Sequence, residues 1–171
     1  MTRILAINGP PRAGKDTLAE HLFIGLTNKG VRCAVTSLAE PIYNSLNLEY
    51  LYGDLTLDEI KKDLSFRNFI TRFAENCVKP VFGETFFVCE TVNKINKSNY
   101  DVVIISDLGF PVELEVLEVY YPVDIIRLEK ENTSFSNDSR RYVGKHKYTV
   151  TNNSDKEDLR KQAEWIIKDY I

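Results

Sequence analysis

Short runs of apolar and β-branched residues alternate along the chain with segments whose apolar residues recur at helical spacing. The runs occupy residues 4–7, 31–36, 102–107, 123–128 and 148–151. Their length and β-branched content predict strands, and the almost fully apolar run over 102–107 is typical of a central parallel strand that is buried on both faces. The alternation of such strands with amphipathic helices predicts an α/β fold. We expect a five-stranded, mainly parallel sheet flanked by helices, in a single domain that spans residues 1–171.

Start and stop signals place the helices between these strands. A helix over 15–28 is expected to end at Gly30, which suits the left-handed conformation that closes many helices. Another helix follows Pro111. Ser154 and Glu157 have the spacing of a capping box and are expected to open the last helix.

The longest departure from the alternation is a mostly helical insert over about residues 38–98. Pro41 is expected to open one helix, and a capping box at Thr56 starts a second. A third helix follows Ser65 and is expected to end at Pro80. The residues expected on its buried face are Phe66, Phe69, Ile70, Phe73 and Cys77.

The opposite side of the third helix carries a polar strip at every fourth position, formed by Arg67, Thr71, Glu75 and Lys79. Two interpretations are open. The strip is either a solvated face with one weak ion pair, or a surface whose arginine holds the phosphate of a second substrate. The insert also holds three tyrosines that either stack on a base or cover apolar surface, namely Tyr43, Tyr50 and Tyr52.

Residues 9–17 read GPPRAGKDT and lie between the first apolar run and the first helix. Strand, glycine-bounded loop, Gly-Lys and helix form the P-loop pattern, which predicts a P-loop NTPase fold. Gly9 and Gly14 leave room for backbone N–H groups to approach a phosphate. The first helical turn adds unpaired N–H groups and a partial positive charge, and Lys15 adds a full charge. The residues expected to bind ATP here are Gly9, Arg12, Ala13, Gly14, Lys15, Asp16 and Thr17.

One position departs from the usual pattern, in which a Ser or Thr after the lysine contacts magnesium. Asp16 stands there, and Thr17 comes one residue later. Asp16 is either a direct Mg²⁺ ligand or an acid favoured by the helix dipole, and the two roles are compatible.

Two places outside the loop could complete a site. Asp107 ends the run over 102–107 and could hold magnesium through water or orient an acceptor, or it could simply cap the following turn. Arg140 and Arg141 lie in a polar segment over about 130–147. That segment is either a solvated loop or a lid whose arginine closes over the γ-phosphate.

Composition and charge restrict the classes of partner and the location that we expect for the protein. The net charge of −3 excludes a strong general attraction to nucleic acid or anionic membrane. No apolar run approaches the roughly 18 residues of a membrane span, and the first strand starts without a preceding signal peptide. The 3 cysteines lack the spacing of metal ligands, so we expect reduced thiols and a cytoplasmic location.

The loop that ends in Gly-Lys-Asp-Thr resembles that of the deoxynucleoside monophosphate kinases of tailed bacteriophages, which are P-loop kinases related in architecture to adenylate kinase. Other segments are similar to the same family: 38–42, 65–83, 106–113, 138–140 and 151–153. Residues 106–111 also resemble the Asp-Gly-Phe-Pro-Arg segment of adenylate kinases. Val112 departs from that segment, because an arginine follows Gly-Phe-Pro there.

The resemblance implies transfer of the γ-phosphoryl group of ATP, with Mg²⁺, to a deoxynucleoside monophosphate. It implies catalytic roles for Lys15, Asp107, Arg140 and Arg141, acceptor contacts by Arg67, Glu75 and Lys79, and magnesium contacts by Asp16 and Asp107. Asn152 would lie near the donor base.

Two other functions remain open. One is phosphorylation of another small phosphorylated acceptor, such as dephospho-coenzyme A, and the other is nucleotide binding without transfer. The sequence sets neither the preferred base and sugar nor the oligomeric state, for which a homodimer is one option.

Overall fold

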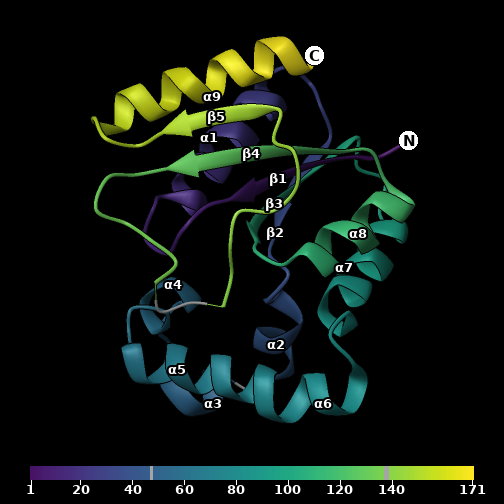
Figure 1. Cartoon of the computed structure of the whole chain (residues 1–171), viewed down its shortest axis with the longest axis vertical. Coiled ribbons are helices and arrows are strands. Elements are labelled where there is room, and N and C mark those ends of the chain that lie inside the picture. The colour runs from purple at the N-terminus through teal and green to yellow at the C-terminus, as the bar shows by residue number, and fades with distance from the viewer. Residues whose placement is uncertain (47, 137–138) are drawn as a thin grey trace.

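The computed structural model describes residues 1–46, 48–136 and 139–171. Within these residues the strands form one parallel sheet in the order β2-β3-β1-β4-β5 (Figure 1). The strands are β1 (Arg3–Asn8), β2 (Cys33–Thr36), β3 (Val102–Leu108), β4 (Val123–Glu129) and β5 (Tyr148–Thr151). The predicted α/β fold class is confirmed, and every strand pair is parallel.

Helices cover both faces of the sheet because alternate residues of the strands point to opposite sides. On one face, α1 (Lys15–Asn28) and α9 (Lys156–Tyr170) pack on side chains such as Leu5 and Ile104. On the other face, α7 (Phe86–Asn96) and α8 (Pro111–Tyr120) pack on their strand neighbours, such as Ile105. Figure 1 shows these two layers with the sheet between them.

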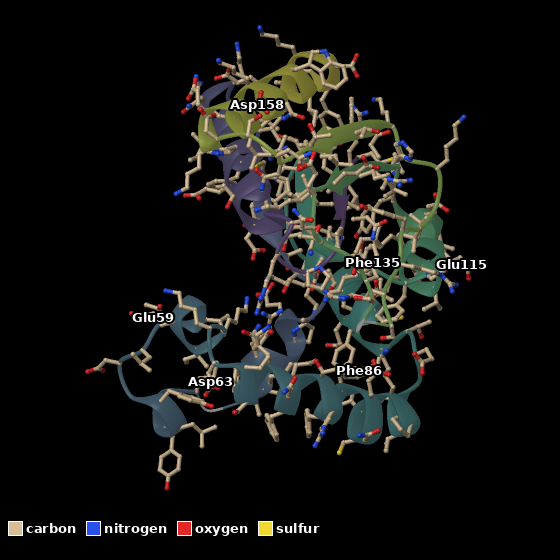
Figure 2. All side chains as sticks on the ribbon, turned by 60° about the vertical axis from the view of Figure 1, so that its left-hand side comes forward. Glu59, Asp63, Phe86, Glu115, Phe135 and Asp158 are labelled. Carbon is tan, nitrogen blue, oxygen red and sulfur yellow. The ribbon has the colours of Figure 1, made fainter. Side chains whose placement is uncertain are left out.

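The segment between β2 and β3 is helical, as predicted. It contains α2 (Glu40–Ser45), α3 (Leu48–Tyr52), α4 (Leu57–Ile60), α5 (Leu64–Phe73), the π-helical segment η1 (Ala74–Val78) and α6 (Lys79–Phe82), followed by α7. Helices α2 to α6 lie at the opposite end of the molecule from α9 (Figures 1 and 2). They share a small core of their own, formed by Ile42, Ile60, Phe66, Ile70, Ala74, Val78 and Phe87.

The predicted buried face of the third insert helix is partly wrong. Phe66 and Ile70 are buried, but Phe69 is 49% exposed and Cys77 is exposed. The helical path also continues past Pro80, because η1 has the wider π-helical turn and Pro80 lies in the first turn of α6, where its missing N–H costs little. The buried positions recur at every fourth residue, Phe66 and Ile70 in α5 followed by Ala74 and Val78 in η1.

The ends of the other helices follow the sequence signals with one correction. The helix over 15–28 and the positive φ of Gly30 are confirmed, and the capping box at Thr56 is present. The last helix is capped by Asp155, whose carboxylate accepts the N–H of Asp158 at 2.8 Å, and not by Ser154. An aspartate directly before the first helical residue is the better placed of the two acceptors.

Among the helices of the described residues, none combines the length and the apolar character that crossing a bilayer requires.

Candidate functional site: a P-loop facing a helical insert

The P-loop follows β1, the central strand. Its backbone makes two left-handed turns, at Arg12 with φ 64° and at Gly14 with φ 99°. Gly9 lies so close to β4 that a Cβ there would be 2.6 Å from the carbonyl oxygen of Leu128. The two glycines therefore allow a compact loop that larger residues would distort.

Lys15 begins α1 directly after this loop. Its ammonium donates to the carbonyl oxygens of Gly9 at 2.9 Å and Pro10 at 2.8 Å, so the side chain folds back over the loop. Asp16 and Thr17 occupy the first turn of α1, with Asp16 exposed and Thr17 partly buried. The loop, the lysine and the helix N-terminus thus lie in the order that phosphate binding requires.

Asn152 contacts the P-loop from the segment after β5. Its side-chain amide donates to the carbonyl oxygen of Ala13 at 2.8 Å. A Cβ on Gly14 would be 2.4 Å from the same amide nitrogen, so glycine is needed there for space as well as for φ.

A hollow of about 320 Å³ lies beside this contact, at the carboxyl ends of β4 and β5. One wall is a stack in which the guanidinium of Arg127 lies 3.9 Å from the ring centroid of Tyr142. The hollow is lined by Arg127, Glu129, Lys130, Glu131, Tyr142, Thr151 and Asn153.

Asp107 lies near the carboxyl end of β3, next to β1. Its carboxylate accepts the N–H of Leu38 at 2.7 Å and the N–H of Ala39 at 3.2 Å. Burial raises the pKa of Asp107, and these two hydrogen bonds oppose the rise. The carboxylate thus ties β3 to the start of the insert, while each oxygen keeps a further lone pair for another partner.

The charges of four predicted site residues act on the hydroxyl of Tyr43, in α2: Asp16, Arg67, Asp107 and Arg140. Burial raises the pKa of the Tyr43 hydroxyl, and the charge of Asp107 adds to the rise. The positive charges of Arg67 and Arg140 lower it in part, and Asp16 raises it slightly. Charge effects of this kind act over short distances, so P-loop, strand, insert and polar segment all contribute a charged group near this hydroxyl.

The insert holds Tyr43 and two cations together. The ring of Tyr43 packs on Phe66 with the ring centroids 6.3 Å apart. Lys61 places its ammonium 4.8 Å from the Tyr43 ring centroid. Arg67 follows Phe66 on the exposed side of α5. Lys61 was not singled out from the sequence, because it lies in a polar stretch with no distinctive spacing.

Lys79 lies elsewhere, beside α8. Its side chain is 9% exposed and pairs with Glu75 at 2.6 Å and with Glu84 at 3.3 Å. Its ammonium also lies 4.5 Å from the ring centroid of Phe110. Burial lowers the pKa of Lys79, but the two carboxylates outweigh it and the pKa is raised. Because twelve helical residues span about 18 Å, Lys79 is separated from Arg67 along the insert.

Arg140 and Arg141 return from the polar segment to the end of β3. The stem of Arg140 packs on Gly109, where an added Cβ would be 2.5 Å from its Cδ. The N–H of Arg141 donates to the carbonyl oxygen of Gly109 at 3.0 Å. Asp138, which belongs to the resemblance over 138–140, lies outside the described residues.

Asn8 is a residue that sequence reasoning missed. It is 1% exposed, and its amide nitrogen donates to the carbonyl oxygens of Leu108 at 2.7 Å and Arg141 at 3.0 Å. Its side-chain oxygen accepts the N–H of Val143 at 2.8 Å. The available signal was a polar residue at the end of an apolar strand, directly before the first P-loop glycine.

The acidic groups fit a magnesium ion held mainly by a nucleotide. The charge of Asp16 contributes to the raised pKa of Asp107, so the two carboxylates repel each other. Mg²⁺ commonly takes one or two carboxylates together with phosphate oxygens and water. In the described part of the chain, no group of three or more His, Cys, Asp or Glu side chains forms a metal site. Phosphates would therefore have to supply the remaining ligands.

A parallel sheet of this order, with the P-loop after its central strand, defines a P-loop nucleotide-binding fold. Comparison with solved structures shows which proteins share this fold. APS kinase from Mycobacterium tuberculosis, as a Cys556Ala mutant, matches with a TM-score of 0.52 and 14% identity over 98% of this chain and 95% of that chain. A putative kinase from Chloroflexus aurantiacus gives a TM-score of 0.51 and 13% identity over 98% and 97%.

A third structure, of the protein APE1195, gives a TM-score of 0.55 and 15% identity over 98% of this chain and 96% of that chain. No family model matches the sequence, and no curated protein matches it. The chain therefore has the fold of P-loop kinases, shared at low identity.

Proposed function

We propose that the protein is an ATP-dependent phosphotransferase whose acceptor is a deoxynucleoside monophosphate. The observation that carries the proposal is the convergence on Tyr43 of charges from Asp16, Asp107, Arg67 and Arg140. A protein that only held a nucleotide would need the P-loop, but it would not need cations supplied by a separate helical insert.

The donor half of the proposal uses the P-loop. The loop amides and Lys15 hold the ATP phosphates, and phosphate oxygens replace the carbonyls of Gly9 and Pro10 as partners of the ammonium. The hollow beside Asn152 and Asn153 takes the base, and the flat stack of Arg127 on Tyr142 suits an aromatic ligand. This extends the sequence prediction for Asn152, which placed it near the donor base.

The acceptor half uses the insert. Arg67 grips the acceptor phosphate, because a guanidinium can hold two phosphate oxygens at once. Arg140, whose charge also acts on the Tyr43 hydroxyl, stabilises the charge of the transferring group, together with Arg141. Glu75 and Lys79, which pair with each other, would contact the acceptor from a second place in the insert, beside Phe110.

The reaction needs no covalent enzyme intermediate. An oxygen of the acceptor phosphate attacks the γ-phosphorus in line, the bond from that phosphorus to the β–γ bridging oxygen breaks, and ADP leaves. Asp16, Thr17 and Asp107 would hold Mg²⁺ directly or through water, and that ion would neutralise charge on the phosphates. Lys15 and the arginines stabilise the same charge from the protein side.

An ADP-release assay with a panel of acceptors tests the proposal. We expect at least one deoxynucleoside monophosphate to accelerate ADP formation by about tenfold or more over ATP alone, since positioning accounts for much of this chemistry. Acceleration by dephospho-coenzyme A alone would assign the other small-acceptor function. Tight ATP binding without any acceleration would indicate a nucleotide-binding protein and overturn the proposal.

The assignment of Arg67 has a matched control on the same helix. Arg67→Ala should raise the acceptor KM while leaving the ATP KM within about twofold, because loss of a charged phosphate contact costs roughly 2 kcal/mol on the acceptor side alone. Arg72→Ala, which changes an exposed arginine of α5, should leave both constants unchanged. Equal effects of the two variants would contradict the assignment.

A further inference from the structure

Glu113, in the first turn of α8, uses one carboxylate oxygen to hold a turn of the main chain. Its Oε2 accepts the N–H of Gly109 at 2.9 Å and the N–H of Phe110 at 2.9 Å. The two donors are consecutive residues directly after β3. A single anionic oxygen therefore fixes the path of the chain between the strand and the helix.

The same turn supports both arginines of the polar segment. The stem of Arg140 packs against Gly109 so closely that any side chain at this position would collide with it. The carbonyl oxygen of Gly109 accepts the N–H of Arg141 at 3.0 Å. A shift of Gly109 would therefore move the backbone at Arg141 and the packing surface of Arg140 together.

Charged groups from β3 and from the insert act on the carboxylate of Glu113, while Arg140 contacts the turn at Gly109 that the carboxylate holds. Asp107 approaches from β3, and Lys79 approaches from the insert together with its partners Glu75 and Glu84. Arg140 lies on the other side of Gly109. Burial is the main reason that the pKa of Glu113 is raised to about 7, Asp107 adds to the rise, and the two N–H groups and Lys79 oppose it.

We infer that Glu113 is a positioning residue: its carboxylate fixes the turn at Gly109 and Phe110 and thereby sets the place of Arg140 and Arg141. The consequence for phosphoryl transfer rests on the proposed function, whereas the effect on the arginines does not. Because Glu113 changes charge near neutral pH, the arginines are held best above that range, where the carboxylate is ionised.

An NMR titration of the ligand-free protein tests the inference without any reaction. The side-chain carboxyl carbon of Glu113 reports its own midpoint, while the amides of Gly109 and Arg141 and the Nε–H of Arg140 report the turn and the arginines. We expect all of them to shift with the midpoint of Glu113 between pH 5 and 9. Signals from Arg140 and Arg141 that ignore this midpoint would overturn the inference.

Two variants separate geometry from charge. Glu113→Gln keeps an oxygen that can accept both N–H groups but cannot ionise, so the shared midpoint should disappear while the amide of Gly109 stays protected from exchange. Glu113→Ala removes the acceptor and should expose that amide. Glu115→Ala is the matched control, since Glu115 is exposed on the same helix (Figure 2). Should Glu113→Ala fail to fold, the wild-type titration and the glutamine variant still decide the question.

Kinetics then connect the turn to transfer. Glu113→Ala should lower kcat by about 10- to 100-fold with the ATP KM within twofold, because misplacing a catalytic group by about 1 Å can cost roughly 100-fold. Glu113→Gln should flatten the wild-type pH profile between pH 6 and 8, and Glu115→Ala should change nothing. An unaltered kcat in Glu113→Ala would overturn the inference, whereas absence of transfer in the wild type would overturn only the proposed function.

Discussion

The sheet with its P-loop and helices α2 to α6 of the insert fix their functional groups by different means. On the sheet side, the chemistry lies in backbone N–H groups and in residues directly attached to strand ends. An added Cβ would collide with Leu128 at Gly9 and with Asn152 at Gly14. On the insert side, the proposed chemistry lies in long side chains such as Lys61, directly after α4, and Arg67, in α5, beside a small core.

We therefore expect the P-loop to bind its phosphates with rigid groups and the insert to bind its ligand with side chains that can adjust. A phosphate held by backbone amides meets groups that cannot rotate away. An acceptor held by lysine and arginine side chains must order them first, and each immobilised side chain costs about 0.5–1.5 kcal/mol. We therefore expect the donor half to be preformed and the acceptor half to tighten when the second substrate arrives.

The largest effect should come from the donor half. Lys15→Ala should lower kcat by at least about 100-fold, because it removes a full charge from the transferring phosphate. Its free energy of unfolding should change by less than about 1 kcal/mol, since the hydrogen bonds of the ammonium to the carbonyl oxygens of the loop can be replaced by water. Steady-state kinetics and urea denaturation measure the two quantities. Lys168→Ala, at an exposed position of α9, is the control and should leave both quantities unchanged. Near-normal turnover in Lys15→Ala would contradict the role of Lys15 in binding the donor phosphates.

The two cores should differ in stability. Ile104→Ala, at a fully buried position of β3, should lower the free energy of unfolding by about 3–5 kcal/mol, the upper part of the usual range. Ile70→Ala, in the smaller core of the insert, should cost about 2–3 kcal/mol because that site can relax toward solvent. Urea denaturation provides the measurement. Equal losses would show that the insert is packed as firmly as the sheet.

The junction between the halves should respond to pH through Glu113. Its folded-state pKa, about 7, lies above the ordinary value of 4.5. The folded state therefore binds this proton more tightly, and the associated stability is fully present below pH 4.5 and is lost as pH rises through 7. The loss is at most about 3 kcal/mol. Denaturation curves of wild type and Glu113→Gln between pH 4 and 8 should diverge by this amount, and parallel curves would contradict the prediction.

The smallest effect concerns the start of the last helix, far from both halves of the site. Asp155→Ala should cost about 1 kcal/mol, since it removes the cap on the N–H of Asp158. Ser154→Ala should stay within about 0.5 kcal/mol, as is usual for surface changes. Thermal denaturation compares the two variants. A larger loss of stability in Ser154→Ala would support the capping box at Ser154 that the sequence predicts.

Most of the sheet side could be predicted from the sequence because its signals are local. A buried parallel strand is an apolar run, and the P-loop is defined by glycine and lysine spacing, so β3 and α1 lie where the patterns placed them. The insert was harder to predict. Whether Phe69 or Ala74 faces the core depends on which helices distant in sequence pack against α5 and η1, and the residues next to them do not indicate this packing.

The candidate site divides in the same way. Lys15 was predicted from the P-loop spacing and Asp107 from its place at the end of an apolar run, whereas Asn8 acts through hydrogen bonds to Leu108, Arg141 and Val143, which only the folded chain brings near. Arg67 and Lys79 share one polar strip in the sequence. The structure sets them apart, because Lys79 turns toward Phe110 and Glu84.

The three hydrogen bonds of Asn8 bear on how fast the site can close. They attach the polar segment to β1 and β3 at Arg141 and Val143, so the backbone beside Arg140 is anchored at that end. An arginine at an anchored position changes place mainly by rotating its own bonds, whereas a travelling loop must also move its backbone, which takes nanoseconds to microseconds. Under the proposed function, movement of this arginine would then not be the slow step of a turnover, whose rate would be set by ordering of the insert, by product departure or by the chemistry itself.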